Sequence, residues 1–236
     1  MNQRILAGWG FIFAAVAIQI PYTYLILNFD YPDILRKDTG EILSKFHQAG
    51  EPLVWAWFAF ALLGLPLFYS YTYLNEIFKK DNSLLSNVGT FFGLSALLFQ
   101  MIGLLRWVFV VPFLAKLYVQ NSTIETTRVA IEISFQTQHQ LFGVLLGEHI
   151  GQLFTVIWMF CFSYLFFQQK QRSFLISTFG FLSAFVYLCG QTELLTLVTN
   201  IPEIPLTGFL GSLGWLVWMI VVGVVLIRQD GKNKGI

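Results

Sequence analysis

The chain has 236 residues, of which 56% are hydrophobic and only 11% are charged, compared with about 25% charged residues in soluble domains. Its formal net charge of +1 gives no basic surface of the kind that nucleic-acid partners require. The composition excludes an ordinary soluble domain and predicts an integral membrane protein with the lipid bilayer as its first partner.

Six apolar stretches predict six transmembrane helices, because each is near the ~20 residues needed to cross the hydrocarbon core. Backbone polar groups in lipid must be satisfied within their own segment, so the expected fold class is all-α. We expect a single domain, residues 1–236, built as a bundle of six transmembrane helices at residues 5–27, 52–73, 85–117, 141–167, 174–199 and 207–227. The third helix is over-long and is expected to tilt or to project from the bilayer.

The first helix begins like a secretory signal peptide. Arg4 precedes an apolar stretch that contains the small-residue sequence Ala15-Val16-Ala17, which resembles a cleavage site. The apolar run continues beyond this sequence to Leu27. We therefore interpret it as a retained first helix.

The first outer loop, residues 28–51, contains a short amphipathic helix. Asp38 and Glu41 have the spacing of a capping box, Ile42, Leu43 and Phe46 then share one face, and Gly50 ends the run. We expect this helix to lie on the outer membrane interface. An ordinary amphipathic connector is the more common alternative.

The second outer segment, residues 119–140, gives a mixed signal. Val129, Ile131, Ile133 and Phe135 alternate with polar residues, which is a strand pattern. No partner strand is evident, and an unpaired strand is unfavourable. We therefore favour an N-terminal extension of the fourth helix.

Two glycine ridges indicate close helix packing. Gly143, Gly147 and Gly151 are four residues apart in the fourth helix, and Gly89 and Gly93 repeat the spacing in the third. Such spacing lets a neighbouring backbone approach closely. The fourth helix is therefore expected at the centre of the bundle.

The distribution of basic residues predicts the orientation. Basic residues at one set of helix ends dominate over those at the other, where acidic residues are frequent, and the positive-inside rule places the first set in the cytoplasm. The chain is therefore predicted to be a multi-pass protein of the cell (plasma) membrane, N-in/C-in, with both termini cytoplasmic. The cytoplasmic set is Arg4, Lys79, Lys80, Lys170, Arg172, Arg228, Lys232 and Lys234.

Three ionisable residues lie inside the predicted helices, where a charge is costly unless it is paired, hydrated or functional. Arg106 lies in the third helix, Glu148 in the fourth and Glu193 in the fifth. This pattern predicts a ligand, ion or proton site. The alternative is a buried Arg106–Glu148 ion pair, supported by Gln152 or Gln191, that fixes the helix register.

The polar residues have similar depths, in the outer half of the bilayer. At about 1.5 Å per residue, Arg106 lies roughly 15 Å below Lys116 at the outer margin. Glu148 and Gln152 are four residues apart and share an α-helical face, whereas the adjacent Glu148 and His149 cannot both point at one small centre. The candidate ligand-binding or proton-carrying residues are Arg106, Glu148, His149, Gln152, Gln191, Glu193, His139, Gln19, Tyr22 and Trp107.

No metal site and no cofactor are expected. His139 and His149 share a helix and are roughly 15 Å apart along it, so they cannot form a bis-histidine haem site, and no cluster of His and Cys has metal-ligand spacing. No phosphate-binding glycine loop or serine nucleophile motif is present. We interpret His139 as an interfacial hydrogen-bonding residue, with a proton gate as the alternative.

Three motifs resemble those of an uncharacterised bacterial family. They are residues 28–36, Leu105-Arg106-Trp107 with Val111-Pro112, and Leu146-Gly147-Glu148 with Gly151. In these motifs the chain resembles the domain-of-unknown-function family 4386, which comprises small integral membrane proteins. The resemblance runs from the first helix through at least the fourth and implies a multi-helix bacterial membrane protein with no known activity. The signature positions that it implies are Asp30, Tyr31, Pro32, Arg36, Arg106, Trp107, Pro112, Gly147, Glu148 and Gly151.

Three functions fit these residues. The first is binding or moving a small anionic or amphipathic ligand, held by Arg106, while Glu148 or Glu193 exchanges a proton. The second is an intramembrane enzyme acting on a lipid-like substrate, with Glu148 as acid/base and Arg106 as anion clamp. The third is a structural or partner-binding membrane subunit with the Arg–Glu pair as a register lock.

The size of the chain bears on the first function. Six helices are few for an alternating-access transporter, and the sequence shows no three-plus-three repeat. A homodimer would relieve this constraint, although the sequence does not require one. Whether the protein is an enzyme stays open at this point.

Overall fold

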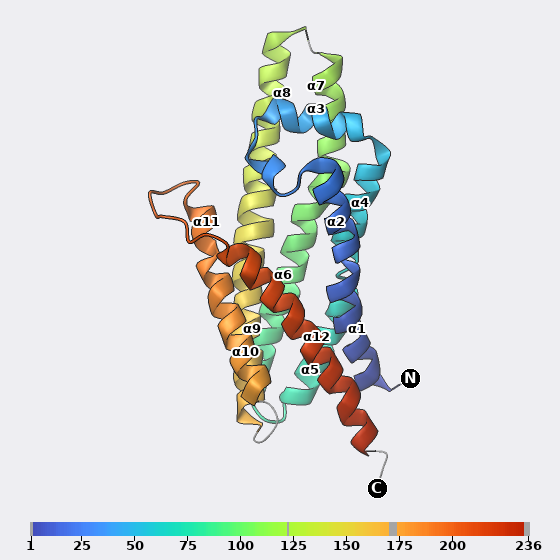
Figure 1. Ribbon diagram of the computed structural model, residues 1–236, viewed down its shortest axis with the longest axis vertical. Coiled ribbons are helices and arrows are strands. Elements are labelled where there is room, and N and C mark those ends of the chain that lie inside the picture. The colour runs from blue at the N-terminus through green and yellow to red at the C-terminus, as the bar shows by residue number, and fades with distance from the viewer. Residues whose placement is uncertain (1, 122, 170–173, 234–236) are drawn as a thin grey trace. The chain divides into compact units, whose positions relative to one another are not determined.

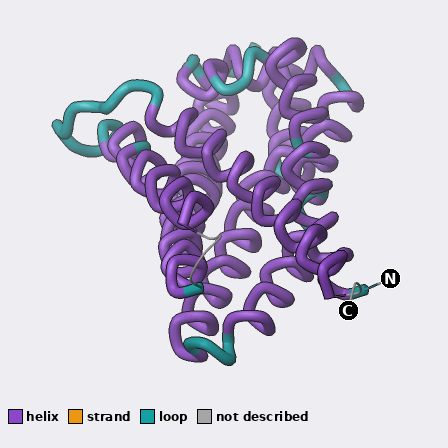
Figure 2. Tube along the Cα trace, turned by 60° about the horizontal axis from the view of Figure 1, so that its bottom comes forward, coloured by secondary structure: helices purple, strands orange, loops and turns teal. Residues whose placement is uncertain are grey.

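A computed structural model of the protein describes residues 2–121, 123–169 and 174–233. All regular elements in these residues are helices, and no strand occurs among them (Figure 2). Figure 1 shows the elements in chain order: α1 Gln3–Ala17, α2 Gln19–Phe29, the 3-10 helix η1 Asp33–Arg36, α3 Thr39–Ala49, α4 Glu51–Leu62, α5 Pro66–Phe78, α6 Ser83–Phe109, α7 Val111–Gln120, α8 Glu125–Gln138, the π-helix η2 His139–Ile150, α9 Gly151–Gln168, α10 Phe174–Cys189, α11 Gln191–Leu195 and α12 Thr207–Asn233.

The prediction of an all-α membrane protein with six transmembrane helices is confirmed. Within the described ranges, six helical stretches are long and apolar enough to cross a bilayer. The predicted bounds are shorter than the observed ones at most ends, because helix ends beyond the apolar run carry polar residues. The stretches are Gln3–Phe29, Glu51–Phe78, Ser83–Gln120, Glu125–Gln168, Phe174–Leu195 and Thr207–Gln229.

Prolines interrupt the first three of these stretches. A proline has no N–H to donate to the carbonyl four residues earlier, and its ring clashes with that carbonyl. The residue four before Pro21 is Ala17, where α1 ends, and the residue four before Pro66 is Leu62, where α4 ends. Pro112 likewise follows the end of α6 and lies in the first turn of α7. The over-long third stretch is therefore two helices.

The fourth stretch confirms the helical interpretation of residues 119–140. Helix α8 begins at Glu125, after the extended residue Ile124, and continues without a gap into η2 and α9. Ile131 and Phe135, which are four residues apart, are buried, while Ile133 is exposed. The alternation that suggested a strand is therefore one buried face of an α-helix.

The described chain divides into two compact units. Unit 1 consists of residues 1–16, 64–99 and 149–236, and unit 2 of residues 17–63 and 100–148. Each unit has a core of its own, and each is described here by itself. The prediction of a single domain over residues 1–236 stays a prediction.

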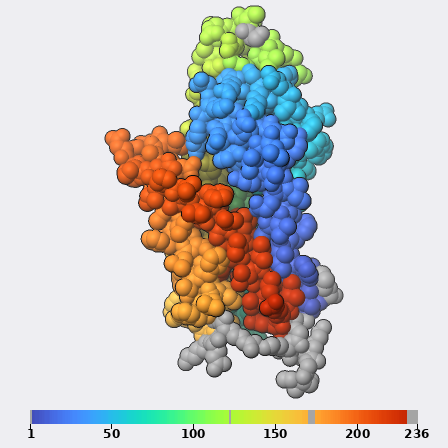
Figure 3. Space-filling model, in the orientation of Figure 1, coloured from blue at the N-terminus to red at the C-terminus, as the bar shows by residue number. Residues whose placement is uncertain are grey.

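Unit 2 has an aromatic core formed around Trp57 and Trp107, both almost fully buried. Helix α3 packs against α7 and α8. The space-filling view shows residues 28–51, the first outer loop, lying against the pair of helices α7 and α8 (Figure 3). Ile42, Leu43 and Phe46 form the buried face of α3, as the sequence predicted. Because this face contacts protein, the geometry favours an amphipathic connector, and a place at the membrane interface stays a prediction.

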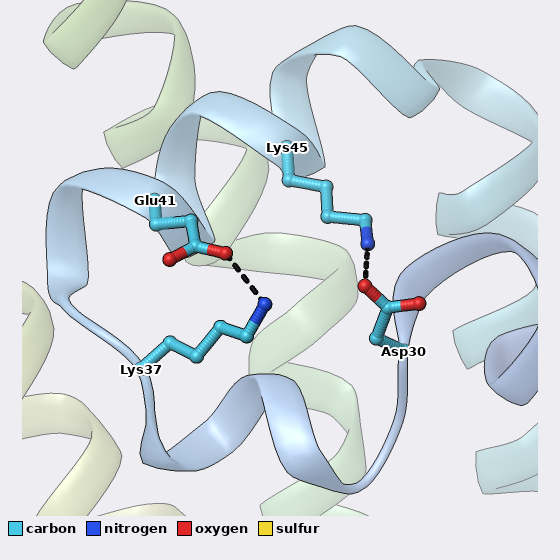
Figure 4. Close-up of polar contacts among 4 residues, drawn as sticks. All are labelled: Asp30, Lys37, Glu41 and Lys45. Atoms are coloured by element: carbon cyan, nitrogen blue, oxygen red, sulfur yellow. Dashed lines mark hydrogen bonds and ion pairs between the residues drawn. The ribbon is translucent and has the colours of Figure 1, made fainter.

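The capping box predicted at the start of α3 is not formed. Helix α3 does begin after Asp38, but the Asp38 side chain makes no capping hydrogen bond. Instead, Glu41 accepts a hydrogen bond from Lys37 Nζ at 2.7 Å (Figure 4). The lysine four residues earlier offers the glutamate a charged partner, which competes with the neutral backbone N–H of a box.

A second ion pair in the same loop joins Lys45 of α3 to Asp30 at the end of α2 (Figure 4). The hydrogen bond from Lys45 and the attraction of its charge lower the pKa of Asp30. The carboxylate is half-exposed, so water screens the pair and its contribution to stability is small. The pair ties α3 back to the chain that leaves α2.

Unit 1 is built from α1, α5, the first part of α6, and α9 to α12. Helix α10 packs against both α9 and α12. The core of unit 1 contains the stacked rings of Tyr71 and Trp158, with centroids 4.0 Å apart. The ring of Trp218 is edge-on to that of Trp158, with centroids 5.2 Å apart. Helices α1 and α12 meet at Gly8 and Gly223, where a Cβ on Gly8 would lie 2.7 Å from the Gly223 carbonyl oxygen.

The glycine ridge predicted at Gly89 and Gly93 packs against α9. A Cβ on Gly93 would lie 2.9 Å from Trp158 Cγ, and one on Gly89 would lie 2.8 Å from the Cβ of Cys161. These contacts need the bare backbone of glycine.

Of the basic residues used for the orientation, Lys170, Arg172 and Lys234 lie outside the described residues, and the orientation stays a prediction.

Candidate functional site

The fourth membrane-spanning stretch contains an uncommon element, the π-helix η2. Its wider turn holds about 4.4 residues, against 3.6 in an α-helix, and such segments are frequent at functional sites. His139 and Glu148, nine positions apart, would lie on opposite sides of an α-helix but are about two full turns apart in a π-helix. The π conformation therefore turns both residues to one side.

Arg106 of α6 lies in unit 2 with only 7% of its surface exposed. Its Nη1 donates a hydrogen bond to the carbonyl of Gly103, and its Nη2 lies 3.4 Å from Nδ1 of His139, which is long for a hydrogen bond. A guanidinium has donors only, so Nδ1 accepts and the imidazole proton is on Nε2. His139 is thus a neutral partner of the buried cation.

Glycines let the guanidinium and η2 approach each other. A Cβ on Gly143 would overlap Nη2 of Arg106 and lie 2.7 Å from its Cζ. One helical turn further along α6, a Cβ on Gly103 would lie 2.8 Å from the Cα of Gly147. The predicted ridge of Gly143 and Gly147 therefore faces α6, and the Arg106 side chain occupies the space that a side chain at Gly143 would need.

Aromatic rings surround this cation. The Cζ atom of Arg106 lies 5.2 Å from the ring centroid of Trp107, a cation–π distance. Trp107 is stacked on Trp57, with centroids 4.8 Å apart and planes 8° apart. The His139 ring is stacked on Phe135 at 5.6 Å. The charge thus lies over one indole ring, and the two aromatic residues that it contacts, Trp107 and His139, are each stacked on a further ring.

Glu148 is the second charged candidate in unit 2. Its side chain is half-buried, and a Coulomb attraction acts between it and Arg106. The guanidinium also contacts the ring of His139. The predicted buried ion pair is therefore supported weakly, as a charge interaction.

The remaining candidates of unit 2 lie on α2. Tyr22 is half-buried and packs edge-on against Tyr31, with centroids 5.7 Å apart, and against Phe60 at 6.0 Å. Gln19 is exposed. Tyr22 therefore reaches the aromatic core of the unit, whereas Gln19 lies at its surface.

The other candidates form a separate group in unit 1. Gln191 is buried, and its Nε2 donates a hydrogen bond of 2.9 Å to Oε1 of Gln152. His149 is half-buried and Glu193 is exposed. The structure thus brings the two glutamines together. Glu193, which the sequence predicted to lie inside a long transmembrane helix, is exposed, because α10 ends at Cys189 and only the short α11 follows.

Gly103 contacts Arg106, and Trp57 and Phe135 stack on Trp107 and His139, but none of the three was among the sequence-predicted residues. A signal was available for Trp57, since tryptophan in a membrane helix is usual near the interfaces and Trp57 lies inside the second apolar run. Phe135 and Gly103 gave no comparable signal. Across the ranges that the structure describes, no group of three His, Cys, Asp or Glu residues is placed to hold a metal ion.

Comparison with known families gives one match that covers almost the whole chain. A family model described as Domain of unknown function (DUF4386) matches residues 6–223. No curated protein and no solved structure matches the chain. The motif residues around Arg106 and Glu148 lie within the matched range.

Proposed function

The chain belongs to the family described as Domain of unknown function (DUF4386), and from this premise we propose that it binds a small anionic or amphipathic ligand within the membrane, with Arg106 holding the negative charge. The observation that carries the proposal is the state of the guanidinium. It is buried in a membrane-spanning stretch, yet its Nε has no hydrogen-bond partner among the described residues.

An unpartnered donor on a buried cation is costly, because desolvation is not compensated by a hydrogen bond. The guanidinium contacts a backbone carbonyl and an imidazole, while the charge of Glu148 acts on it through space. A ligand with a negative group would supply the acceptor that Nε lacks together with a negative charge. This is the use for which intramembrane ionisable residues are typically retained.

Glu148 is proposed to tune this charge. The π-helix turns it to the side of η2 that carries His139, and it attracts Arg106 through space. When Glu148 is ionised it competes with an anionic ligand for the cation, and when it is protonated it does not. Ligand binding would then be coupled to uptake of a proton, which is the step that transport of an anion would use. Glu193, exposed in unit 1, is the weaker candidate for that role.

Location and partners are proposed on the same basis. A bacterial membrane protein with an excess of basic residues at both termini is placed in the plasma membrane with both ends cytoplasmic. The bilayer is its surrounding partner, and nucleic acid is not expected. A homodimer is compatible with the small number of helices and stays a prediction.

Native mass spectrometry of the detergent-purified full chain tests the proposal. We expect a discrete bound mass in the wild type that is lost in Arg106→Ala. Arg128→Ala is the matched control, since Arg128 also lies over an aromatic ring, 5.0 Å from the centroid of Tyr118, and its Nε is likewise without a partner among the described residues, but its side chain is 34% exposed. A bound mass retained in Arg106→Ala, or lost equally in both variants, would contradict the proposal.

A structural role for the same residues is the second candidate, favoured by the aromatic packing of Arg106 against Trp107 and His139. If the Arg106–Glu148 pair fixes the helix register, removing both charges together should leave the stability unchanged, whereas removing either one alone should lower it. In that case Arg106→Leu combined with Glu148→Leu keeps the wild-type stability, while either change alone lowers the unfolding temperature. No bound mass would be seen in any variant.

A further inference from the structure

Three buried side-chain N–H groups of unit 2 have no acceptor among the described residues. They are Nε of Arg106, Nε of Arg128 and the indole Nε1 of Trp57, whose side chain is fully buried. Buried backbone and side-chain donors are satisfied in nearly all folded proteins, so each exception needs a physical explanation. The donors of Trp57 and Arg106 are singled out because both residues pack against Trp107, whereas Arg128 packs against Tyr118.

Both donors belong to residues that pack against the same ring. The Trp57 ring is stacked on Trp107 at 4.8 Å, and the Arg106 Cζ lies 5.2 Å from the centroid of Trp107. They come from α4 and α6, two elements that are far apart in the chain. The Gly103 carbonyl and His139 Nδ1 face Nη1 and Nη2 of the guanidinium, not its Nε.

We propose that Trp57 is a further ligand-binding residue, and that its indole N–H and Arg106 Nε–H donate to the oxygens of one oxyanion, a carboxylate or a phosphate, at the end of an acyl chain. This inference rests on the proposed function. An oxyanion has several lone pairs and no donor, so it can satisfy two donors at once. The flanking aromatic rings favour an apolar remainder of the ligand.

The neutral indole and the charged guanidinium contribute in different ways. Arg106 supplies charge and one hydrogen bond, whereas Trp57 supplies a hydrogen bond without charge. Removing the indole N–H should therefore weaken an anionic ligand and leave an uncharged ligand of the same chain length almost unaffected. A water molecule that satisfied Trp57 Nε1 would predict no difference between the two.

Trp57→Phe tests the inference, because it removes the N–H and keeps an aromatic ring. The full chain in maltoside micelles is titrated with decanoate, decyl phosphate and decanol. We expect Trp57→Phe to weaken binding of decanoate or decyl phosphate by about tenfold and binding of decanol by less than twofold. A larger effect on decanoate indicates a carboxylate ligand, and a larger effect on decyl phosphate indicates a phosphate.

Trp158→Phe is the matched control. Trp158 is also fully buried with an unpartnered Nε1, but it lies in unit 1. Equal losses in both variants would overturn the inference. If Arg106→Ala abolishes anion binding while Trp57→Phe binds within twofold of wild type, Trp57 is not a ligand contact and the proposed function stands. If the wild type binds neither anion, both the inference and the proposed function fail.

An independent measurement covers the case in which Trp57→Phe does not fold. The wild type labelled with 15N-tryptophan has seven indoles, and their N–H signals can be followed during the same titrations. We expect one indole proton to move downfield with decanoate or decyl phosphate and not with decanol, as a charge-assisted hydrogen bond requires. Seven signals that respond alike to all three compounds would overturn the inference.

Discussion

Replacing Gly143 by alanine should displace the Arg106 guanidinium, and the structure allows the cost to be worked out. The new methyl carbon would overlap Nη2 and lie 2.7 Å from Cζ, closer than real contacts allow, and 3.1 Å from Nη1, which is a tight contact. The guanidinium then loses its contact with His139 and its place over Trp107. We estimate the loss of a cation–π contact at about 0.5–2 kcal/mol and the overpacking at about 1–3 kcal/mol.

Alanine has a better helix propensity than glycine by about 1 kcal/mol, which offsets part of this cost. We therefore expect Gly143→Ala to lower the free energy of unfolding by about 0.5–4 kcal/mol. The assay is an SDS titration of the full chain in mixed micelles, followed by circular dichroism. Gly64→Ala is the control, because a Cβ at Gly64 meets nothing within 4 Å and should change stability by less than about 0.5 kcal/mol.

The double variant identifies the cause. If the methyl group collides with the guanidinium, Arg106→Ala removes the collision, and the Gly143 methyl then fills part of the space left behind. The losses of unfolding free energy in Gly143→Ala and in Arg106→Ala should therefore sum to about 1–3 kcal/mol more than the loss in the double variant. Additive effects within about 0.5 kcal/mol, or a Gly143→Ala protein as stable as the wild type, would refute the assignment of the Arg106 position.

Two further predictions concern the polar contacts of unit 2. The pKa of Asp30 is lowered in the folded protein, so its pair with Lys45 stabilises the fold at a pH above the pKa of the unfolded carboxyl, and this contribution is lost as the pH falls through the lower, folded pKa. The difference in unfolding free energy between wild type and Asp30→Asn should therefore shrink over that acid range. A difference that does not change with pH would contradict this prediction. Tyr118→Phe should destabilise unit 2 by about 1–2 kcal/mol, because the hydroxyl accepts from Arg128 Nη2 at 2.6 Å and donates to Glu132 at 2.9 Å; an unfolding midpoint equal to that of the wild type would show that neither bond contributes.

Much of the architecture could be predicted from the sequence, because the length of an apolar run is fixed by the thickness of the bilayer. The six stretches, the helical extension at α8 and the buried face of α3 all follow from hydrophobic pattern. Arg106 was identified for the same reason, as a charge where apolar residues are required. These are properties of single segments, which is why one sequence was enough.

The surroundings of Arg106 could not be predicted in the same way. With α-helical spacing, Glu148 shares a face with Gln152 and points away from His139, whereas the π turn of η2 brings His139 and Glu148 to one side. Nothing in the composition of residues 139–150 distinguishes the two hydrogen-bond registers. The stacking of Trp57 on Trp107 depends on how α4 and α6 pack, which a pattern within one helix does not contain.

The π-helix also has a consequence for changes in chain length. Its twelve residues complete about 2.7 turns, and about ten residues of α-helix complete the same number. A deletion of two residues within η2 could therefore be absorbed by a return to the α conformation, with the phase of the turn kept at both ends. The hydrophobic span would survive, but His139 and Glu148 would no longer point the same way. In this segment, the number of residues determines the chemistry around Arg106, and insertions or deletions there would alter the site before they altered the fold.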